Sequence, residues 1–368
     1  MYKRAIDVLK FKPVDRLPAV HFGYWYELLV EWAEQGKISW DLVNCNWDNT
    51  QKEKELDKIL GWDHNWCCNY GGKMGLNPVF ESKVLEELPN GFVRMQNADG
   101  LIERVKVGVQ GIPAEDDYQL KDRKAWEELY KPKMQFSMDR VDLEFFKNFR
   151  KENYDHPVGL EMGSVIGSIR NMLSVIGLSY TLCDDYELME EIVDTYAEMQ
   201  YQVIKTILES GATFDFAHYW EDMCFNNGPL MNPMDFEDLC AKHYKKRNDL
   251  VKSYGIDIIS LDCDGVTDRL LPIWFNNGVN TMFPIEIGTW GDQFVAAREK
   301  FGKGMLGVGG FDKTVLRIDR EAVDREIERL KPIIAMGGFI PCPDHRLMPG
   351  TKFELVQYYI DKIKNIKL

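Results

Sequence analysis

Long hydrophobic runs are absent from this sequence of 368 residues. None approaches the roughly 20 consecutive apolar residues of a membrane-spanning helix. The first eight residues also lack the apolar segment of a signal peptide. These absences predict a cytoplasmic protein with no membrane partner.

Cysteines are few and scattered, with 8 in the whole chain. Small secreted proteins held together by disulfides carry a higher and more regular density of them. Cys67 and Cys68 are adjacent and therefore lack the CxxC spacing of a redox or metal motif. For most of the cysteines, the simplest interpretation is a small buried side chain.

Basic residues are outnumbered: 45 Lys and Arg stand against 59 Asp and Glu, which gives a net charge of −14. A nucleic-acid binder needs a positively charged face to meet the phosphates. We therefore expect no nucleic-acid partner.

What the sequence does contain is an alternation of short apolar strands and amphipathic helices from about residue 155 onward. The predicted strands cover 157–161, 213–218, 257–262, 281–285, 304–308 and 338–341. The predicted helices between and after them cover 185–210, 233–253, 266–277, 291–301, 319–333 and 352–366. The helix at 185–210 has the clearest apolar stripe, and Gly211 marks its end.

This alternation predicts a (β/α)₈ barrel. Short apolar strands are typical of parallel sheets that are covered on both faces. Six β/α units are visible after residue 155, and one or two more fit the N-terminal third, where 17–22 is a predicted strand. No Gly-x-Gly-x-x-Gly joins a strand to a helix, which disfavours a dinucleotide-binding fold.

We expect the whole chain, 1–368, to form one barrel domain. Residues 50–125 would be an elaboration on it, with a helix at 50–60 and a β-meander over 76–112. Turn sequences at Pro89–Gly91 and Asn97–Gly100 divide the meander.

Polar residues gather where the predicted strands end. Active sites of (β/α)₈ barrels lie at the carboxyl ends of the strands, so these residues are the candidates for function. They are His21, Glu161, His218, Glu221, Asp222, Cys263, Asp264, Glu286, Asp312, Cys342, Asp344 and His345.

Two thiols and a carboxylate among them, Cys263, Cys342 and Glu286, predict a zinc site. The alternative for each cysteine is a small buried residue, and for Glu286 an ion pair or a helix cap. Glu221 is a candidate fourth zinc ligand or a proton carrier. The other options for the fourth position are His218, His345, Cys224 and water.

Three further side chains are candidates for acid–base or orienting roles. His218 and His345 could carry protons or bind the metal, although a single histidine is more often a core or hydrogen-bonding residue. Asp312 could orient a neighbour, but a cap on the following helix is at least as good an interpretation.

Three segments resemble the uroporphyrinogen decarboxylase superfamily, and in particular its methyltransferase branch. They are Phe11-Lys-Pro-Val-Asp-Arg-Leu-Pro18, His218-Tyr-Trp-Glu-Asp-Met-Cys-Phe-Asn-Asn-Gly-Pro229 and Gly337-Gly-Phe-Ile-Pro-Cys-Pro-Asp-His345. The resemblance covers essentially the whole chain and implies a (β/α)₈ barrel. It also implies a methyltransferase that uses zinc and a corrinoid.

The sequence departs from individual members of that superfamily. The arginine-rich N-terminal stretch of the true decarboxylases is missing here. The methylcobalamin:coenzyme M methyltransferases hold zinc with a His-x-Cys motif, whereas position 261 is Leu. The corrinoid-dependent O-demethylase methyltransferases look similar because they tolerate a carboxylate beside two cysteines.

The resulting hypothesis is a zinc-dependent methyltransferase component of an O-demethylase system. A methyl ether, aromatic in view of the Trp and Tyr residues near strand ends, would give its methyl group to the Co(I) of a corrinoid protein docked at the carboxyl-terminal face of the barrel. Alternatives are a methylcobalamin methyltransferase that activates a thiol, a metal-independent decarboxylase and a barrel that only binds. Superfamily members are often dimers, so a homodimer is possible.

Overall fold

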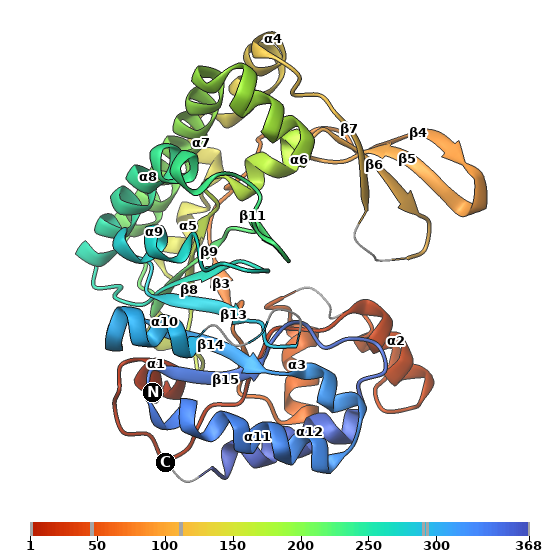
Figure 1. The fold of residues 1–368 in the computed structure, drawn as a ribbon, viewed down its shortest axis with the longest axis vertical. Coiled ribbons are helices and arrows are strands. Elements are labelled where there is room, and N and C mark those ends of the chain that lie inside the picture. Colours follow the sequence, from red (N-terminus) through yellow and green to blue (C-terminus); the bar gives the residue numbers. More distant parts are fainter. Residues whose placement is uncertain (1–2, 45–47, 110–112, 289–290, 292–293, 367–368) are drawn as a thin grey trace.

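Short parallel strands form the wall of a curved sheet at the centre of the molecule (Figure 1). The computed structural model describes residues 3–44, 48–109, 113–288, 291 and 294–366. The strands of this wall are β1 (Val20–His21), β2 (His64–Asn65), β3 (Asn69–Tyr70), β8 (Gly159–Gly163), β9 (Phe216–Trp220), β12 (Ile259–Asp262), β13 (Thr281–Ile285), β14 (Leu306–Phe311) and β15 (Phe339–Pro343).

The wall has the strand order of a (β/α)₈ barrel. One seven-stranded sheet runs β15-β14-β13-β12-β9-β8-β3, and β1 pairs in parallel with β2, which precedes β3 directly in the chain. The side between β15 and β1 is joined by backbone hydrogen bonds: Leu347 donates to Gly23 at 3.0 Å and accepts from Trp25 at 2.9 Å. The predicted fold class is confirmed.

Burial on both faces explains why the strands are so apolar. Every residue of β13, β14 and β15 is buried, as expected for strands between a barrel core and a layer of helices. The barrel interior contains large rings. Trp66 stacks on Phe216 with the ring centroids 4.6 Å apart, and Phe22 meets Phe283 edge-on at 4.5 Å.

Helices surround the wall, and side-chain caps set where several of them begin. Asp185 accepts from the backbone N–H of Leu188 at the start of α7, and Asp319 accepts from that of Ala322 at the start of α11. No helix in the described part of the chain is both long and apolar enough to cross a bilayer. The main helices are α1 (Arg4–Leu9), α2 (Tyr26–Glu34), α3 (Gln51–Leu60), α6 (Gly167–Asp184), α7 (Tyr186–Glu209), α8 (Pro233–Ser253), α9 (Leu271–Asn276), α10 (Phe294–Phe301), α11 (Arg320–Ala335) and α12 (Phe353–Lys364).

An antiparallel meander interrupts the barrel between β3 and β8. Its strands pair in the order β4-β5-β6-β7 and extend to one side of the barrel (Figure 1). The segment that returns to β8 contains α4 (Arg123–Ala125) and α5 (Leu143–Lys147). The predicted meander is therefore present, with bounds β4 (Lys83–Leu88), β5 (Phe92–Gln96), β6 (Leu101–Lys106) and β7 (Ala114–Tyr118).

The largest difference from the predicted elements is the helix expected over 266–277. The structure begins it at Leu271, with Pro272 in its first turn, where proline's missing N–H costs nothing. Residues 263–270 instead form a loop at the carboxyl end of β12. Asp264 of this loop lines the cavity described next.

Candidate functional site

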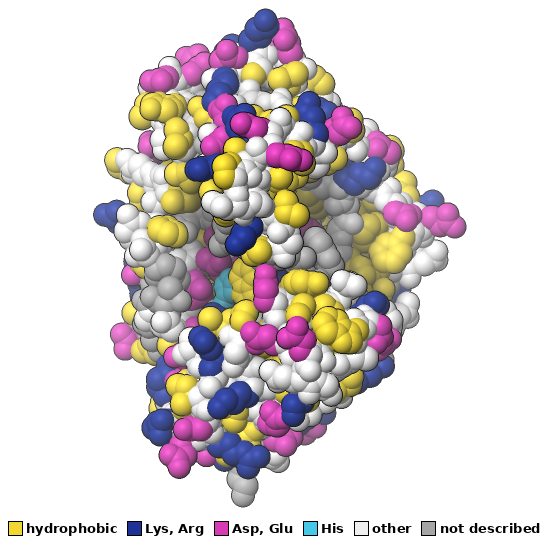
Figure 2. Space-filling view, turned by 90° about the vertical axis from the view of Figure 1, so that its right-hand side faces the viewer, with side chains coloured by type: hydrophobic (Ala, Val, Ile, Leu, Met, Phe, Trp, Pro, Cys, Tyr) yellow, Lys and Arg dark blue, Asp and Glu magenta, His cyan; other side chains and the backbone are white. Residues whose placement is uncertain are grey.

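A cavity of about 410 Å³ opens at the carboxyl ends of the barrel strands, and we call it the mouth cavity. This is where (β/α)₈ enzymes place their active sites. Figure 2 looks onto this end of the molecule and shows a hollow across the face, with a histidine and acidic side chains in it. The lining residues are Phe22, Asp48, Asn49, Cys67, Asn69, Glu161, His218, Trp220, Asp222, Asp262, Asp264, His345 and Arg346.

Side-chain alternation along the strands decides which residues face this cavity. On β9, His218 and Trp220 line it, whereas the hydroxyl of Tyr219 between them points outward and donates to Asn248 of α8 at 2.8 Å. Asp262 of β12 pairs with Trp220 in the parallel register and faces the same way. Successive residues of a strand lie on opposite faces, so every second residue is inward.

The same alternation turns Cys263 away from the mouth cavity. Its side chain is buried, and its thiol lies against the thiol of Cys224. Burial raises the pKa of Cys263 well above its usual range, and the neighbouring thiol adds to that effect. The residue at the end of β12 that faces the cavity is Asp262.

Three side chains, one from the turn between β2 and β3 and two from strands β9 and β12, come together as possible metal ligands. The ligand atoms of Cys67, His218 and Asp262 lie within 4.8 Å of one another. Burial lowers the pKa of His218 to about 3, so its imidazole is neutral, the form that binds metals. Its Nδ1 is buried and has no hydrogen-bond partner in the described part of the chain.

The carboxylates around this group repel one another. Burial raises the pKa of Asp262 well above its usual range, and the charges of Asp264 and Asp222 raise it further. The pKa of Asp222 rises to about 6, again through burial first and Asp264 second. A bound cation would relieve both the burial of charge and the repulsion.

A second group of possible ligands adjoins the first. Ligand atoms of Asp264, Glu286 and His345 also lie within 4.8 Å of one another. Nε2 of His345 is 3.3 Å from a carboxylate oxygen of Asp264, and Glu286 accepts from the backbone N–H of Gly265 at 2.9 Å. The ring of Trp25 stacks on that of His345, with the centroids 6.3 Å apart.

Glu221 holds the start of a helix and does not line the cavity. Its carboxylate is fully buried and accepts from the backbone N–H groups of Val165, Ile166 and Gly167 at 2.5–2.8 Å. The hydroxyls of Ser164 and Tyr244 donate to it as well, at 3.0 and 2.6 Å. These five donors occupy the oxygens that a metal or a substrate proton would need.

Cys342 and Asp312 do not line the mouth cavity either. Cys342 is fully buried in β15, and burial raises the pKa of its thiol. Asp312 accepts from the backbone N–H of Thr314 at 2.9 Å and from its hydroxyl at 2.6 Å, which is the helix cap that the sequence left open as an alternative.

The predicted ligand set of Cys263, Cys342, Glu286 and Glu221 is therefore not brought together. Of the candidates at the predicted strand ends, five line the mouth cavity, and Glu286 adjoins it through His345; the five are Glu161, His218, Asp222, Asp264 and His345. Sequence reasoning passed over Cys67 and Asp262. Asp262 has the same strand parity as Ser260, which the structure shows facing the barrel interior, where it accepts from the indole of Trp66 at 3.1 Å.

The sequence matches one family of known proteins. A sequence model of uroporphyrinogen decarboxylase (URO-D) matches residues 161–366, more than half of the chain. The chain belongs to the uroporphyrinogen decarboxylase family. Searching curated protein sequences gives no match.

Among solved structures, a methyltransferase from Methanosarcina mazei superposes with a TM-score of 0.59 at 16% identity. The match covers 98% of this chain and 97% of that one. At this identity the likeness shows a shared fold. A vitamin-B12 independent methionine synthase from Listeria monocytogenes gives a TM-score of 0.46 at 13% identity, over 96% of this chain and 98% of that one, which is too low to carry an argument.

Proposed function

We propose that this chain is the methyltransferase component of an O-demethylase system. It would take a methyl group from an aromatic methyl ether and pass it to the Co(I) centre of a separate corrinoid protein, with the help of zinc. The observation that carries the proposal is the group of Cys67, His218 and Asp262 on the floor of the mouth cavity.

The chemistry of this group fits zinc. Thiolate, neutral imidazole and carboxylate are the three side-chain ligand types that zinc accepts in proteins. The unpartnered Nδ1 of His218 and the mutual repulsion around Asp262 both favour a cation here. When bound, Zn²⁺ supplies a Lewis acid that assists departure of the ether oxygen.

The chain supplies a carboxyl group for the proton that the departing oxygen needs. Glu161 lines the same cavity, and burial raises its pKa, which increases the fraction that holds a proton. A neutral carboxylic acid beside the leaving group is the arrangement of general acid catalysis. Glu161 would take the proton-donor role that the sequence suggested for Glu221.

Aromatic side chains at the cavity suit a flat substrate. Phe22 and Trp220 both line it, and Trp220 is partly exposed although it ends a barrel strand. Flat apolar faces beside a few polar groups are typical of sites for small aromatic ligands.

The charges of the cavity argue against decarboxylation of a polycarboxylate. Asp222 and Asp264 line it, and their negative charges would repel such a substrate. Its single arginine is already engaged: the guanidinium of Arg346 donates to both carboxylate oxygens of Asp48, at 2.9 and 2.6 Å. Polycarboxylates need free cationic partners instead.

The experiment is a methyl-transfer assay with a methoxyarene and a reduced corrinoid protein. Zinc-loaded wild type should methylate the corrinoid, and both chelator-treated wild type and Cys67→Ser should lose most of the transfer. Cys68→Ser is the matched control, since its thiol donates to the backbone oxygen of Pro157 at 2.9 Å and does not line the mouth cavity.

Full transfer by metal-free protein would contradict the zinc proposal. Methylation of an added thiol in place of the corrinoid would leave the metal site standing but would change the acceptor to the thiol that the alternative hypothesis names.

A further inference from the structure

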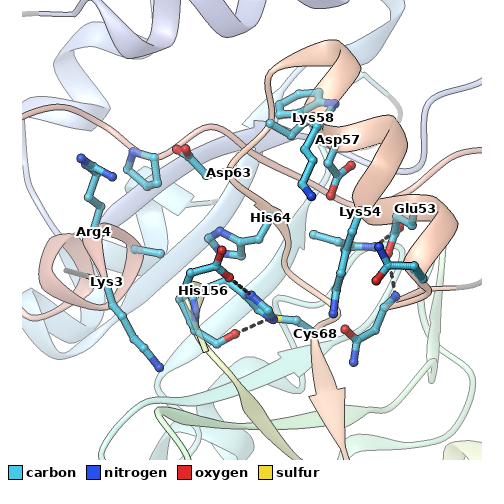
Figure 3. A pocket seen from close by; sticks show the side chains of 18 residues that line it. Lys3, Arg4, Glu53, Lys54, Asp57, Lys58, Asp63, His64, Cys68 and His156 are labelled. Atoms are coloured by element: carbon cyan, nitrogen blue, oxygen red, sulfur yellow. Dashed lines mark hydrogen bonds and ion pairs between the residues drawn. The ribbon is translucent and has the colours of Figure 1, made fainter. Parts of the chain in front are cut away.

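A second cavity, of about 370 Å³, lies outside the barrel wall between α1 and α3. Figure 3 shows it from close by: Lys54 and Lys58 descend from α3 on one side, Lys3 and Arg4 lie on the other, and His64 and His156 stand between them. We call it the α1–α3 cavity. It is lined by the starts of the chain's strands and not by their carboxyl ends, and nothing in the proposed reaction uses it.

Two imidazole nitrogens in this cavity have no partner. Nε2 of His64 and Nε2 of His156 are buried and contact no hydrogen-bond donor or acceptor in the described part of the chain. The side chain of His64 is itself more than nine-tenths buried. Buried polar atoms are nearly always paired, so two unpartnered nitrogens on residues that line one cavity indicate a missing ligand.

The form of each imidazole follows from its surroundings. Burial lowers the pKa of His64 to about 3, so this ring is neutral. Nδ1 of His156 lies 2.8 Å from the carboxylate of Asp155 and must donate to it, which leaves the lone pair on Nε2 facing inward. The ligand must therefore be able to donate a hydrogen bond to His156.

Every carboxylate of the cavity has another partner. Glu53 accepts from the backbone N–H of Asn49 at 2.6 Å and from the side chain of Asn65 at 2.7 Å. Burial also raises the pKa of Glu53 to about 7, so it carries only part of its charge near neutrality.

The remaining carboxylates are held in the same way. Asp57 lies 2.9 Å from Nε2 of His21, and Asp63 accepts from Arg16 at 2.7 Å. The carboxylate of Asp155 is taken by His156, as described above.

Two lysines of the cavity, Lys54 and the exposed Lys58, form no ion pair with any residue that the structure describes. Lys54 is half-buried, and its ammonium group forms no ion pair or hydrogen bond with any residue that the structure describes. Its charge is close enough to lower the pKa of His156, as does that of Lys3, whose own partner is Asp215 at 2.6 Å. The ammonium groups of Lys54 and Lys58 therefore offer positive charge that no ion pair among the described residues satisfies, and this favours an anion. The described residues around the two imidazoles also form no metal-ligating group of three.

We propose that the α1–α3 cavity binds inorganic phosphate. Phosphate oxygens accept hydrogen bonds from Lys54, and the proton that inorganic phosphate retains near neutral pH is donated to Nε2 of His156. A carboxylate has no such proton at this pH, and neither has sulfate. The site thus distinguishes phosphate from sulfate and carboxylates by a buried hydrogen-bond acceptor, to which only phosphate can donate.

The test is isothermal titration calorimetry of the full chain in a buffer free of phosphate and sulfate. Inorganic phosphate should bind at one site, and Lys54→Gln should weaken it by roughly tenfold or more, the usual loss for a hydrogen bond to a charged group. Lys52→Gln is the matched control, because Lys52 lies on the same helix but outside the cavity and donates to the backbone oxygen of Asp41 at 2.5 Å. It should bind phosphate as the wild type does.

Two further titrations sharpen the test. Sulfate should bind about tenfold more weakly than phosphate, since it cannot donate to His156. Glycerol 3-phosphate, most of which has lost that proton near neutral pH, should likewise bind more weakly than inorganic phosphate, and tighter binding would contradict donation to His156. No saturable heat with inorganic phosphate, equal binding by Lys54→Gln, or sulfate as tight as phosphate would overturn the proposal.

Discussion

The mouth cavity and the α1–α3 cavity are built from the same kinds of side chain and differ in charge. Each contains cysteine and histidine, and the two cysteines are neighbours in the chain: Cys67 lines the first cavity and Cys68 the second. Both cysteines lie in the short connection between β2 and β3, so this one segment contributes to two sites on the two sides of the barrel wall.

This difference in charge indicates that the groups around a neutral histidine determine whether its site favours a cation or an anion. His218 lies beside buried acids such as Asp262, whereas the charges of Lys54 and Lys3 lower the pKa of His156. Both imidazoles are neutral and have an unpartnered nitrogen. Acids around such a nitrogen favour a metal cation, and lysines around it favour an anion.

The largest expected effect is on zinc affinity, which should depend on a histidine of the mouth cavity and not on a histidine of the α1–α3 cavity. His218→Gln should lower zinc affinity by more than the roughly 10- to 100-fold that loss of an outer-shell partner costs. His64→Gln should leave zinc affinity unchanged, because His64 lies in the other cavity. Competition with a chromogenic chelator measures both, and equal losses in the two variants would remove the distinction between the cavities.

Glu221 should affect folding, although it lies close in sequence to the mouth residues. Glu221→Gln replaces a buried carboxylate that accepts five hydrogen bonds, and it should lower the free energy of unfolding by about 3 kcal/mol. The exposed Glu237→Gln on α8 should change it by less than about 0.5 kcal/mol. Urea denaturation measures both. A stable Glu221→Gln protein with impaired zinc binding would instead place Glu221 in the metal site.

A smaller effect, of pH on stability, should come from His64. Its pKa is about 3 in the folded protein and near its ordinary value of 6.5 in the unfolded chain. Between these values the unfolded state binds the extra proton, so stability is present above pH 6.5 and is lost as pH falls. From pH 7 to pH 5 this loss should be about 2 kcal/mol larger in wild type than in His64→Gln. Parallel curves of unfolding free energy against pH would contradict the buried neutral form.

Much of the fold could be predicted from the sequence because its signals are local. The strand predicted at 281–285 has those bounds in the structure, and the helix predicted at 233–253 does as well. Alternation and capping residues are read within a few positions. The later start of α9 was not predicted, because the apolar spacing of a helix already begins before Pro272. In the structure, the residues before Leu271 form the loop beside the mouth cavity.

The candidate site was harder to predict because it depends on register. Cys263 and Asp262 are equally good ligands in the sequence, and only the pairing of β12 with β9 shows that Asp262 faces inward. Cys67 gave no signal, since it lies in the turn between two very short strands and its partners are more than 100 positions away. The extent of the domain, 1–368, stays a prediction.

The most direct test of this account is the metal content of two neighbouring substitutions, in protein purified without added metal. Wild type and Cys263→Ser should each hold about one zinc per chain, and Asp262→Asn should hold almost none. Loss of zinc from Cys263→Ser, with zinc retained by Asp262→Asn, would contradict the assignment of the inward faces of β9 and β12 as the metal site.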